Sequence, residues 1–169
     1  MKFQKKIILP TVLITFILSA CNTSTDQYGN VNLSEEETKV KEVITAYKSG
    51  IESLSVEGLS DLFMKKSEVF ESGSDEGSFS HYLDHHLAPE LEAFESFDFN
   101  DHKMKVKIDM PYAFTTETYT FKIVVKSDEP EGGQVIERKG VATSVLKFEN
   151  DQWKIMKTHS SSRGMSSSH

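Results

Sequence analysis

The chain has 169 residues, one cysteine and a formal net charge of −7. A single cysteine excludes an internal disulfide framework. The acidic balance argues against nucleic acid as a partner, because binding nucleic acid requires a basic surface that neutralises phosphates. The length is that of one ordinary domain with a short extension.

The first 21 residues have the pattern of a bacterial lipoprotein signal. Three lysines precede an apolar run over residues 7–18, and Leu-Ser-Ala then leads to Cys21. Because the run is too short to span a bilayer, residues 1–20 are predicted to be a removable signal peptide. Cys21 is the expected site of lipidation, which would anchor the protein to a bacterial membrane in the cell envelope, on its periplasmic or extracytoplasmic face. Loss of the three lysines would lower the net charge from −7 to −10.

Three further segments follow from composition. Residues 21–33, which begin at the lipidated cysteine, are polar and aperiodic, as is typical of a flexible tether. Residues 34–163 contain the periodic patterns and are predicted to form one folded domain. Residues 164–169 are rich in serine and are predicted to be a disordered tail.

The first half of the domain has helical periodicity. Ser34 and Glu37 have the spacing of a capping box, and apolar residues recur at helical spacing from there to Leu54. A shorter helical segment and a brief strand over residues 68–71 come next. A third helix is predicted over residues 78–94, although Pro89 can kink it.

The second half has the period of two that is typical of strands. Apolar residues alternate with charged ones over residues 103–110, and further strands are predicted over residues 119–125, 141–148 and 153–160. Helices, a short strand, another helix and then a four-strand antiparallel meander describe an α+β domain whose curved sheet wraps around helices.

This order of elements resembles the nuclear transport factor 2-like superfamily, which includes SnoaL-like polyketide cyclases and ketosteroid isomerases. The resemblance rests on the helix pair and strand within residues 40–73 and on the ending VLKFENDQWKI at residues 145–155, and it covers roughly residues 35–163. It implies a cone-shaped α+β fold, with a curved antiparallel sheet wrapped around the N-terminal helices and a central cavity. It also allows a homodimer through the open face of the sheet. Because this fold hosts enzymes and binding modules alike, it implies no particular activity.

Three polar side chains are predicted on faces that otherwise bury apolar residues. His86 shares the buried side of the third helix with Glu90, Glu117 shares a strand face with aromatic residues, and His159 shares parity with the apolar residues of the last strand. Burial of such groups is costly without partners, so their convergence predicts a polar site in an apolar pocket.

A metal site is one interpretation of this convergence. Imidazole and carboxylate are ligands for zinc, copper or iron(II), and His86, His159 and either Glu90 or Glu71 supply three of them. A divalent metal would then be the cofactor or the cargo.

Acid–base catalysis is a second interpretation. Glu117 or Glu71 would take a proton from a substrate carbon, and Tyr47, Tyr112 or His159 would hold the resulting oxyanion. The chain would then be an isomerase, cyclase or lyase of the SnoaL-like type.

The third interpretation is a pocket that binds without chemistry. His86 and His159 would be satisfied by hydrogen bonds, and Arg163 would pair with Glu90 or Glu92 or hold a ligand carboxylate at the pocket mouth. The sequence favours this interpretation: an anchored lipoprotein that binds a small molecule or metal ion through His86, Glu117, His159 and Arg163. Enzymatic function, with Glu117 and His159 as the catalytic pair, is the alternative.

Overall fold

The computed structural model describes residues 31–130 and 132–165. The predicted signal peptide, Cys21 and most of the predicted tether lie outside these residues, as do the last four residues of the predicted tail. Among the helices that are described, none combines the length and the apolar character that crossing a membrane requires.

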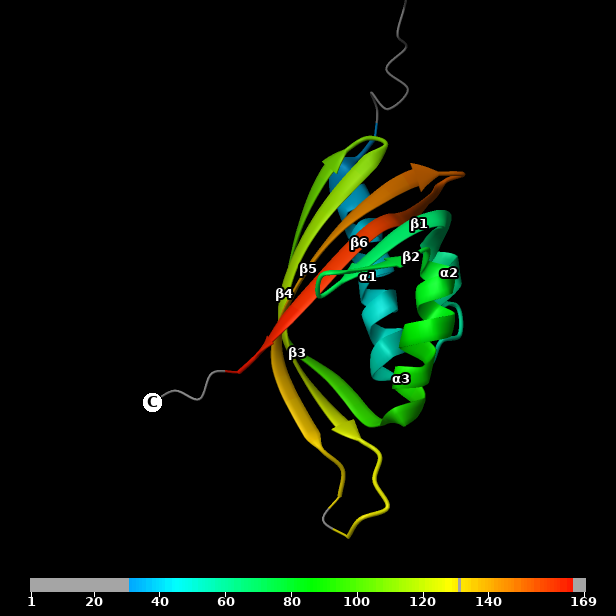
Figure 1. Cartoon of the computed structure of the whole chain (residues 1–169). Coiled ribbons are helices and arrows are strands. Elements are labelled where there is room, and N and C mark those ends of the chain that lie inside the picture. The colour runs from blue at the N-terminus through cyan, green and yellow to red at the C-terminus, as the bar shows by residue number, and fades with distance from the viewer. Residues whose placement is uncertain (1–30, 131, 166–169) are drawn as a thin grey trace, which may run out of the picture.

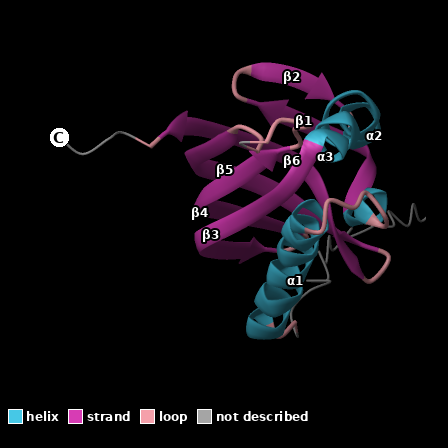
Figure 2. Cartoon of the chain, turned by 90° about the horizontal axis from the view of Figure 1, so that it is seen from below, coloured by secondary structure: helices cyan, strands magenta, loops and turns pink. Residues whose placement is uncertain are grey.

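Six strands form one curved sheet in the order β2-β1-β6-β5-β4-β3 (Figures 1 and 2). The strands are β1 (Phe63–Glu71), β2 (Ser74–Gly77), β3 (Phe94–Asp109), β4 (Tyr112–Val125), β5 (Val135–Glu149) and β6 (Gln152–Gly164). The predicted meander is formed by β3 to β6, which pair antiparallel. The sheet as a whole is mixed rather than antiparallel, because β1 lies beside β6 and runs parallel to it.

Helices cover one face of this sheet (Figure 1). They are α1 (Leu33–Glu52), the short 3₁₀ turn η1 (Leu59–Leu62), α2 (Phe79–Tyr82), the π-turn η2 (Leu83–Leu87) and α3 (Ala88–Ala93). The last three follow one another without a break and together form the predicted third helix. Pro89 has no N–H to donate to the preceding turn, and the backbone widens into the π-turn directly before α3.

The N-terminal cap of α1 differs from the prediction. Asn32 accepts hydrogen bonds at its side-chain oxygen from the backbone N–H groups of Ser34 (3.2 Å) and Glu35 (3.4 Å). Asparagine is as good an N-cap as serine, so the helix begins at Leu33. The predicted capping box between Ser34 and Glu37 therefore does not form.

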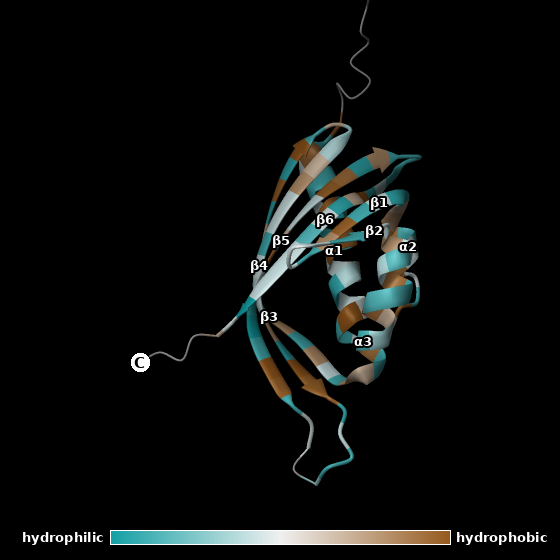
Figure 3. Cartoon of the chain, viewed as in Figure 1, coloured by the Kyte–Doolittle hydropathy of each residue, from teal (hydrophilic) through white to brown (hydrophobic). Residues whose placement is uncertain are grey.

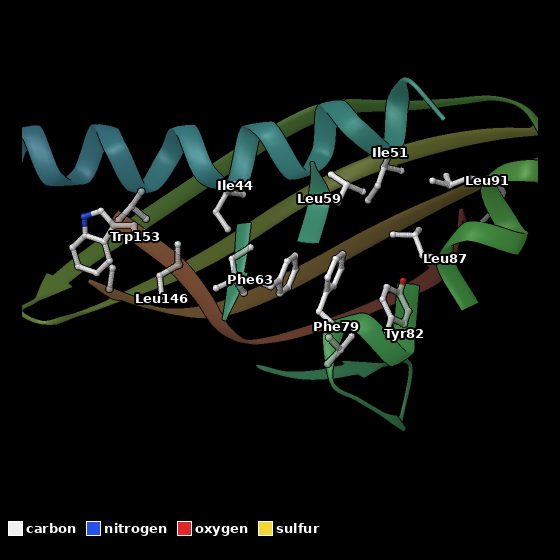
Figure 4. Packing of buried hydrophobic residues seen from close by; sticks show 14 residues of the cluster. Ile44, Ile51, Leu59, Phe63, Phe79, Tyr82, Leu87, Leu91, Leu146 and Trp153 are labelled. Atoms are coloured by element: carbon white, nitrogen blue, oxygen red, sulfur yellow. The ribbon is translucent and has the colours of Figure 1, made fainter. Parts of the chain in front are cut away.

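The hydrophobic core lies between α1 and the sheet (Figure 4). Ile44 of α1 and Leu146 of β5 are almost fully buried, with exposed fractions of 2% and 0%. Phe63 and Phe79 stack with their ring centroids 3.6 Å apart. Each fully buried side chain of this size contributes about 1.5–3 kcal/mol to stability.

The strand β3 begins at Phe94, well before the predicted start at residue 103. Hydrophilic and hydrophobic residues alternate along the long strands (Figure 3). In β3 this alternation is interrupted, because Asp101 and His102 together stand opposite the single residue Tyr119 of β4. This β-bulge separates Phe97 and Phe99 from the regular pattern that follows, which is why the sequence pattern locates only the second half of the strand.

Candidate functional site

A cavity of about 360 Å³ lies between the sheet, α1 and the segment α2–α3. Much of its wall is aromatic, with rings from Tyr47, Tyr82, Phe94, Phe97, Phe99, Tyr119 and Phe121. Ile51, Leu87 and Leu91, which also line it, are labelled in Figure 4. The volume and the apolar wall are those of a pocket for a small organic ligand.

Glu117 of β4 is buried in this wall, with an exposed fraction of 3%. The two threonines on either side of it face outward, as the period of two of a strand requires. The predicted inward position of Glu117 is therefore confirmed, while its role remains to be proposed.

His102 of β3 lies beside Glu117. Its Nε2 is 2.7 Å from Oε2 of Glu117, and the imidazole is 26% exposed, so it lies between the buried carboxylate and solvent. The bulge in β3 gives His102 this position, with Asp101 in the left-handed region at φ 52°. Sequence reasoning missed His102, because simple alternation has no place for an extra residue.

Lys48 of α1 is the third member of this group. Its Nζ is 3.4 Å from Oε2 of Glu117 and lies over the rings of Tyr119 (3.7 Å to the centroid) and Phe99 (4.0 Å). Burial lowers the pKa of Lys48, and the charge of Glu117 offsets only part of this effect. The sequence did carry a signal here: Lys48 stands on the buried stripe of α1, four residues after Ile44.

Gly140 gives Tyr119 its position. The two residues are directly paired across β5 and β4, and a Cβ at Gly140 would lie 2.2 Å from Cε2 of the tyrosine ring. The ring can therefore lie over β5 only because residue 140 has no side chain. The contact between Lys48 and this ring depends on that space.

The buried phenols remain hydrogen-bond donors. Burial raises the pKa of Tyr47 and of Tyr119, and the nearby charges of Glu71 and Glu117 raise both further. Each hydroxyl is therefore protonated over the whole physiological pH range.

A second polar group lies around Tyr82 and His86. The Tyr82 hydroxyl donates to Oε2 of Glu71 (2.8 Å), while the imidazole of His86 is 3.3 Å from Oε1 of Glu90 and 3.4 Å from Oε2 of Glu76. Burial opposes a charge on His86, but the three carboxylates outweigh burial and raise its pKa. Glu71 and Glu90 line the cavity, whereas His86 lies behind them and is 32% exposed.

His159 does not face the cavity, contrary to the prediction. Met156 is an extra residue in β6, because Ile155 and Lys157 pair with neighbouring positions of β5. This bulge reverses the parity counted from Ile155, so His159 is exposed on the outer face of the sheet. Thr158, Ser160 and Ser162 line the cavity in its place.

Arg163 is also exposed on the outer face, as the same shift in parity requires, and it does not line the cavity. Arg138 of β5 lines the cavity instead. Its Nε donates to Oγ of Ser162 (2.8 Å), and its Nη2 donates to the backbone oxygen of Ser162 (3.0 Å). Of the other predicted donors, Tyr47 lines the cavity, whereas Tyr112 is 38% exposed and does not.

The predicted metal ligands are brought together only in part. His86 lies 3.3 Å from Glu90 and 3.8 Å from Glu71, but His159 faces the other side of the sheet. Within residues 31–130 and 132–165, no three His, Cys, Asp or Glu side chains are placed to hold one metal ion.

The model of the SnoaL-like domain family matches residues 40–164, which is most of the chain. A search of proteins with curated functions gives no match.

Several solved structures share the fold. A nuclear transport factor 2-like superfamily protein from Salmonella enterica superposes with a TM-score of 0.66 at 16% identity, over 81% of this chain and 96% of that one. A candidate dehydratase from Streptomyces avermitilis gives 0.68 at 18% identity, over 79% and 99%. A type 2 hexachlorocyclohexane dehydrochlorinase gives 0.65 at 12% identity, over 81% and 93%. At these identities the similarity establishes the fold alone.

Proposed function

The chain belongs to the SnoaL-like domain family. From this premise and from the group formed by Glu117, His102 and Lys48, we propose that it is an acid–base enzyme of the lyase or isomerase type. The observation that carries the proposal is a carboxylate, 3% exposed, in the wall of an apolar cavity and in contact with an imidazole and an ammonium group. Such pairs of titratable groups in a cleft are typical of catalytic sites.

Glu117 is the proposed general base. It is the carboxylate of the group, it is 3% exposed and it lines the cavity, so a substrate C–H group in the cavity lies within its reach. The C–H bond breaks, an O–H bond forms on the carboxylate, and the electron pair moves into the substrate. In an isomerase the pair enters a carbonyl group to give an enolate, and in a lyase it expels a leaving group from the adjacent carbon.

His102 and Lys48 have different proposed roles. The partly exposed ring of His102 connects the carboxylate to solvent, so it can accept the proton and release it or return it. Lys48 presents a positive charge in a cavity of low dielectric, where it stabilises the negative charge that develops on the substrate. The protonated hydroxyls of Tyr47 and Tyr119 can donate to the same developing oxyanion.

A pocket that binds without catalysis was the interpretation favoured by the sequence. Two observations support catalysis over it. Structures of similar fold include a candidate dehydratase and a dehydrochlorinase, both of which are eliminating enzymes by name. The cavity wall also holds the buried carboxylate of Glu117 in contact with the buried ammonium of Lys48, which a passive apolar pocket does not need, and burying such charges is costly.

A probe that reports proton abstraction alone tests the proposal. A nitrobenzisoxazole loses a ring proton to a base, its N–O bond breaks, and a coloured nitrophenolate forms. The full chain, purified in detergent, is expected to accelerate this ring opening, and Glu117→Gln is expected to reduce the rate by about 100-fold or more. The rate is followed by absorbance at saturating probe.

His102→Gln and His159→Gln form a matched pair of controls. His102 contacts Glu117, so its replacement should lower the rate and alter its pH profile, whereas His159 on the outer face should be neutral. Binding of the probe without acceleration, or a Glu117→Gln variant as active as the parent, would overturn the proposal in favour of a binding module.

A further inference from the structure

One wall of the cavity is polar and comes from the ends of β5 and β6. Ser144, Thr158, Ser160 and Ser162 line it together with Arg138. The hydroxyl groups of Ser144 and Thr158 are 2.9 Å apart and satisfy each other. The Met156 bulge brings the hydroxyls of Thr158, Ser160 and Ser162 of β6 into this wall.

The guanidinium of Arg138 is fixed along one edge and open along the other. Ser162 accepts from Nε at 2.8 Å and from Nη2 at 3.0 Å, which orients the plane of the group. Arginine has five N–H donors, and these two hydrogen bonds leave the end formed by Nη1 and Nη2 with a pair of parallel donors. A pair of this geometry matches the two oxygens of a carboxylate.

The charges around the cavity single out Arg138. Lys48 contacts Glu117, the carboxylate of Glu71 accepts from Tyr82, and Glu90 lies beside His86. Among the described residues Arg138 forms no ion pair, although it is the second cation of the cavity wall. A charge that is held in place by the neighbouring strand β6 and left without a counter-charge is suited to an anionic ligand.

We propose that Arg138, assisted by the free hydroxyl of Ser160, binds a carboxylate of the substrate, so that the substrate is an apolar, ring-bearing organic acid. This inference rests on the proposed function only in that the ligand is taken to be a substrate. The interaction itself is one of binding and involves no proton transfer. The aromatic wall accommodates the ring, and Arg138 fixes which end of the molecule approaches Glu117.

The register of the strands separates Arg138 from Glu117 along the cavity wall. Glu117 is paired with Ala142 of β5, and Arg138 lies four residues before Ala142 in the same strand, on the same face. Four residues span about 13 Å at about 3.3 Å per residue. The guanidinium is bonded to Ser162, which pairs with Gly140, so it lies two residues nearer to Ala142 than this backbone spacing. The carboxylate and the reacting carbon are therefore close enough to be joined by a short ring system.

Naphthoate and its neutral analogue naphthamide test this subsite, since they have the same shape and differ in charge. The full chain in detergent is titrated with each, and binding is followed by naphthalene fluorescence. Naphthoate is expected to bind at least about tenfold more tightly than naphthamide. Equal affinities, or a preference for the amide, would overturn the inference without any variant.

Variants then locate the preference. Arg138→Gln is expected to abolish it, and Arg138→Lys to keep part of it, because lysine retains the charge but lacks the paired donors. Arg163→Gln, on the outer face, is the matched control and should keep the full preference. An unchanged preference in Arg138→Gln, or its loss in Arg163→Gln, would overturn the assignment. Neither naphthoate nor naphthamide undergoes proton transfer in this experiment. A negative binding result therefore does not affect the nitrobenzisoxazole test of catalysis, and a negative result in that test does not affect this one.

Discussion

Gly140 shows how a residue without a side chain can determine the geometry of the cavity. The Tyr119 ring occupies the space that a Cβ would take, with Cε2 only 2.2 Å from that position. Lys48 rests on the same ring, 3.7 Å from its centroid. A substitution at Gly140 would therefore displace the Tyr119 ring and, with it, the ammonium group of Lys48. It would do so without direct contact with Lys48 or Glu117.

Gly140→Ala is expected to destabilise the protein by about 1–3 kcal/mol, because the methyl group overlaps a buried ring. Gly164→Ala is the matched control: it lies on the neighbouring strand, and an added Cβ there meets nothing within 4 Å. Urea denaturation of both variants measures the difference. Equal midpoints would show that the ring moves aside without cost.

The contacts of His86 predict a pH-dependent contribution to stability. Its pKa in the folded state is raised by Glu90, Glu71 and Glu76, against the effect of burial. Since the folded protein holds this proton more tightly than the unfolded chain, the stabilisation is complete below about pH 6.5 and is lost as pH rises through the folded pKa. The ion pairs are partly exposed, so the contribution is at most about 1 kcal/mol.

His86→Gln should therefore lower the unfolding free energy more at about pH 5.5 than at about pH 8.5. His85→Gln, one residue earlier on the exposed side of the same helix, is the control and should change the unfolding free energy by less than about 0.5 kcal/mol. An effect of His86→Gln that is the same at both pH values would mean that the carboxylates do not favour the charged imidazole.

Single residues of the site were predictable only where the local pattern is regular. Glu117 was found because β4 alternates without interruption around it. Lys48 could be detected as a lysine on the buried stripe of α1. Its partner Glu117 could not be assigned to it, because the contact between α1 and β4 is a tertiary contact that no local pattern encodes. His102 was missed and His159 was misplaced, and both errors come from β-bulges. In β3 the apolar pattern changes phase between Phe99 and Met104, and in β6 no apolar residue follows Met156 to reveal the shift.

At the scale of elements, one buried hydrogen bond joins α1 to β6. Trp153 donates from Nε1 to Oε2 of Glu36 at 2.6 Å, and Lys39 donates to the other oxygen at 2.8 Å. Burial opposes the charge of Glu36, but these two hydrogen bonds outweigh it and lower the pKa. This contribution to stability is present above the unfolded pKa and is lost as pH falls through the folded value.

Glu36→Leu should cost about 1–3 kcal/mol, because it leaves the indole N–H buried without an acceptor. Glu36→Gln retains an acceptor and should cost less. Glu37→Leu, the neighbour on the exposed side, serves as the control and should change stability by less than about 0.5 kcal/mol. Urea denaturation near neutral pH ranks the three, and a Glu36→Leu variant as stable as the Glu37→Leu variant would contradict the expectation.

Elements with strong periodicity were predicted well, and their pairing less so. The first helix, the third helix and the four-strand meander follow from periods near 3.6 and 2. The parallel pairing of β1 with β6 was not predicted, because nothing local in β1 specifies a partner about ninety residues away, and parallel pairing needs only a long connection. Which residues of the helix face the core beyond Ala88 depends on the π-turn before it. Pro89 indicates that the helix is irregular there, but it does not predict a π-turn.

At the scale of the whole molecule, we propose that the domain is held at a bacterial membrane by lipid on Cys21, although this residue lies outside the described part of the chain. In a bacterial host grown with radiolabelled palmitate, the wild-type chain should carry the label and Cys21→Ser should not. Ser24→Ala, in the tether, is the control and should be labelled normally. The label is the decisive measurement, since an uncleaved apolar leader could itself hold the Cys21→Ser chain at the membrane. Label on Cys21→Ser would contradict the anchor.

The fold as a whole was predictable, whereas the chemistry of the cavity was not. The order and periods of the elements were sufficient to predict an α+β sheet wrapped around helices. The contents of the cavity depend on which face each strand end presents, and a shift of one residue exchanges those faces. This is why the predicted His86–His159 pair gave way to a group formed by Glu117, His102 and Lys48.

The Met156 bulge has a consequence for the evolutionary history of this cavity. Ser160 faces inward five positions after the buried Ile155, whereas a regular strand would bring the equivalent residue there after four. Descent from an ancestor with a regular strand would thus require the insertion of one codon, which lengthens β6 and leaves every inward residue in place. A homologue without this codon should be aligned with a one-residue gap at Met156. An alignment without the gap would match His159 to an inward-facing residue of the homologue. The residues of β6 that line the cavity beside Arg138 would then be compared with residues that are not equivalent to them.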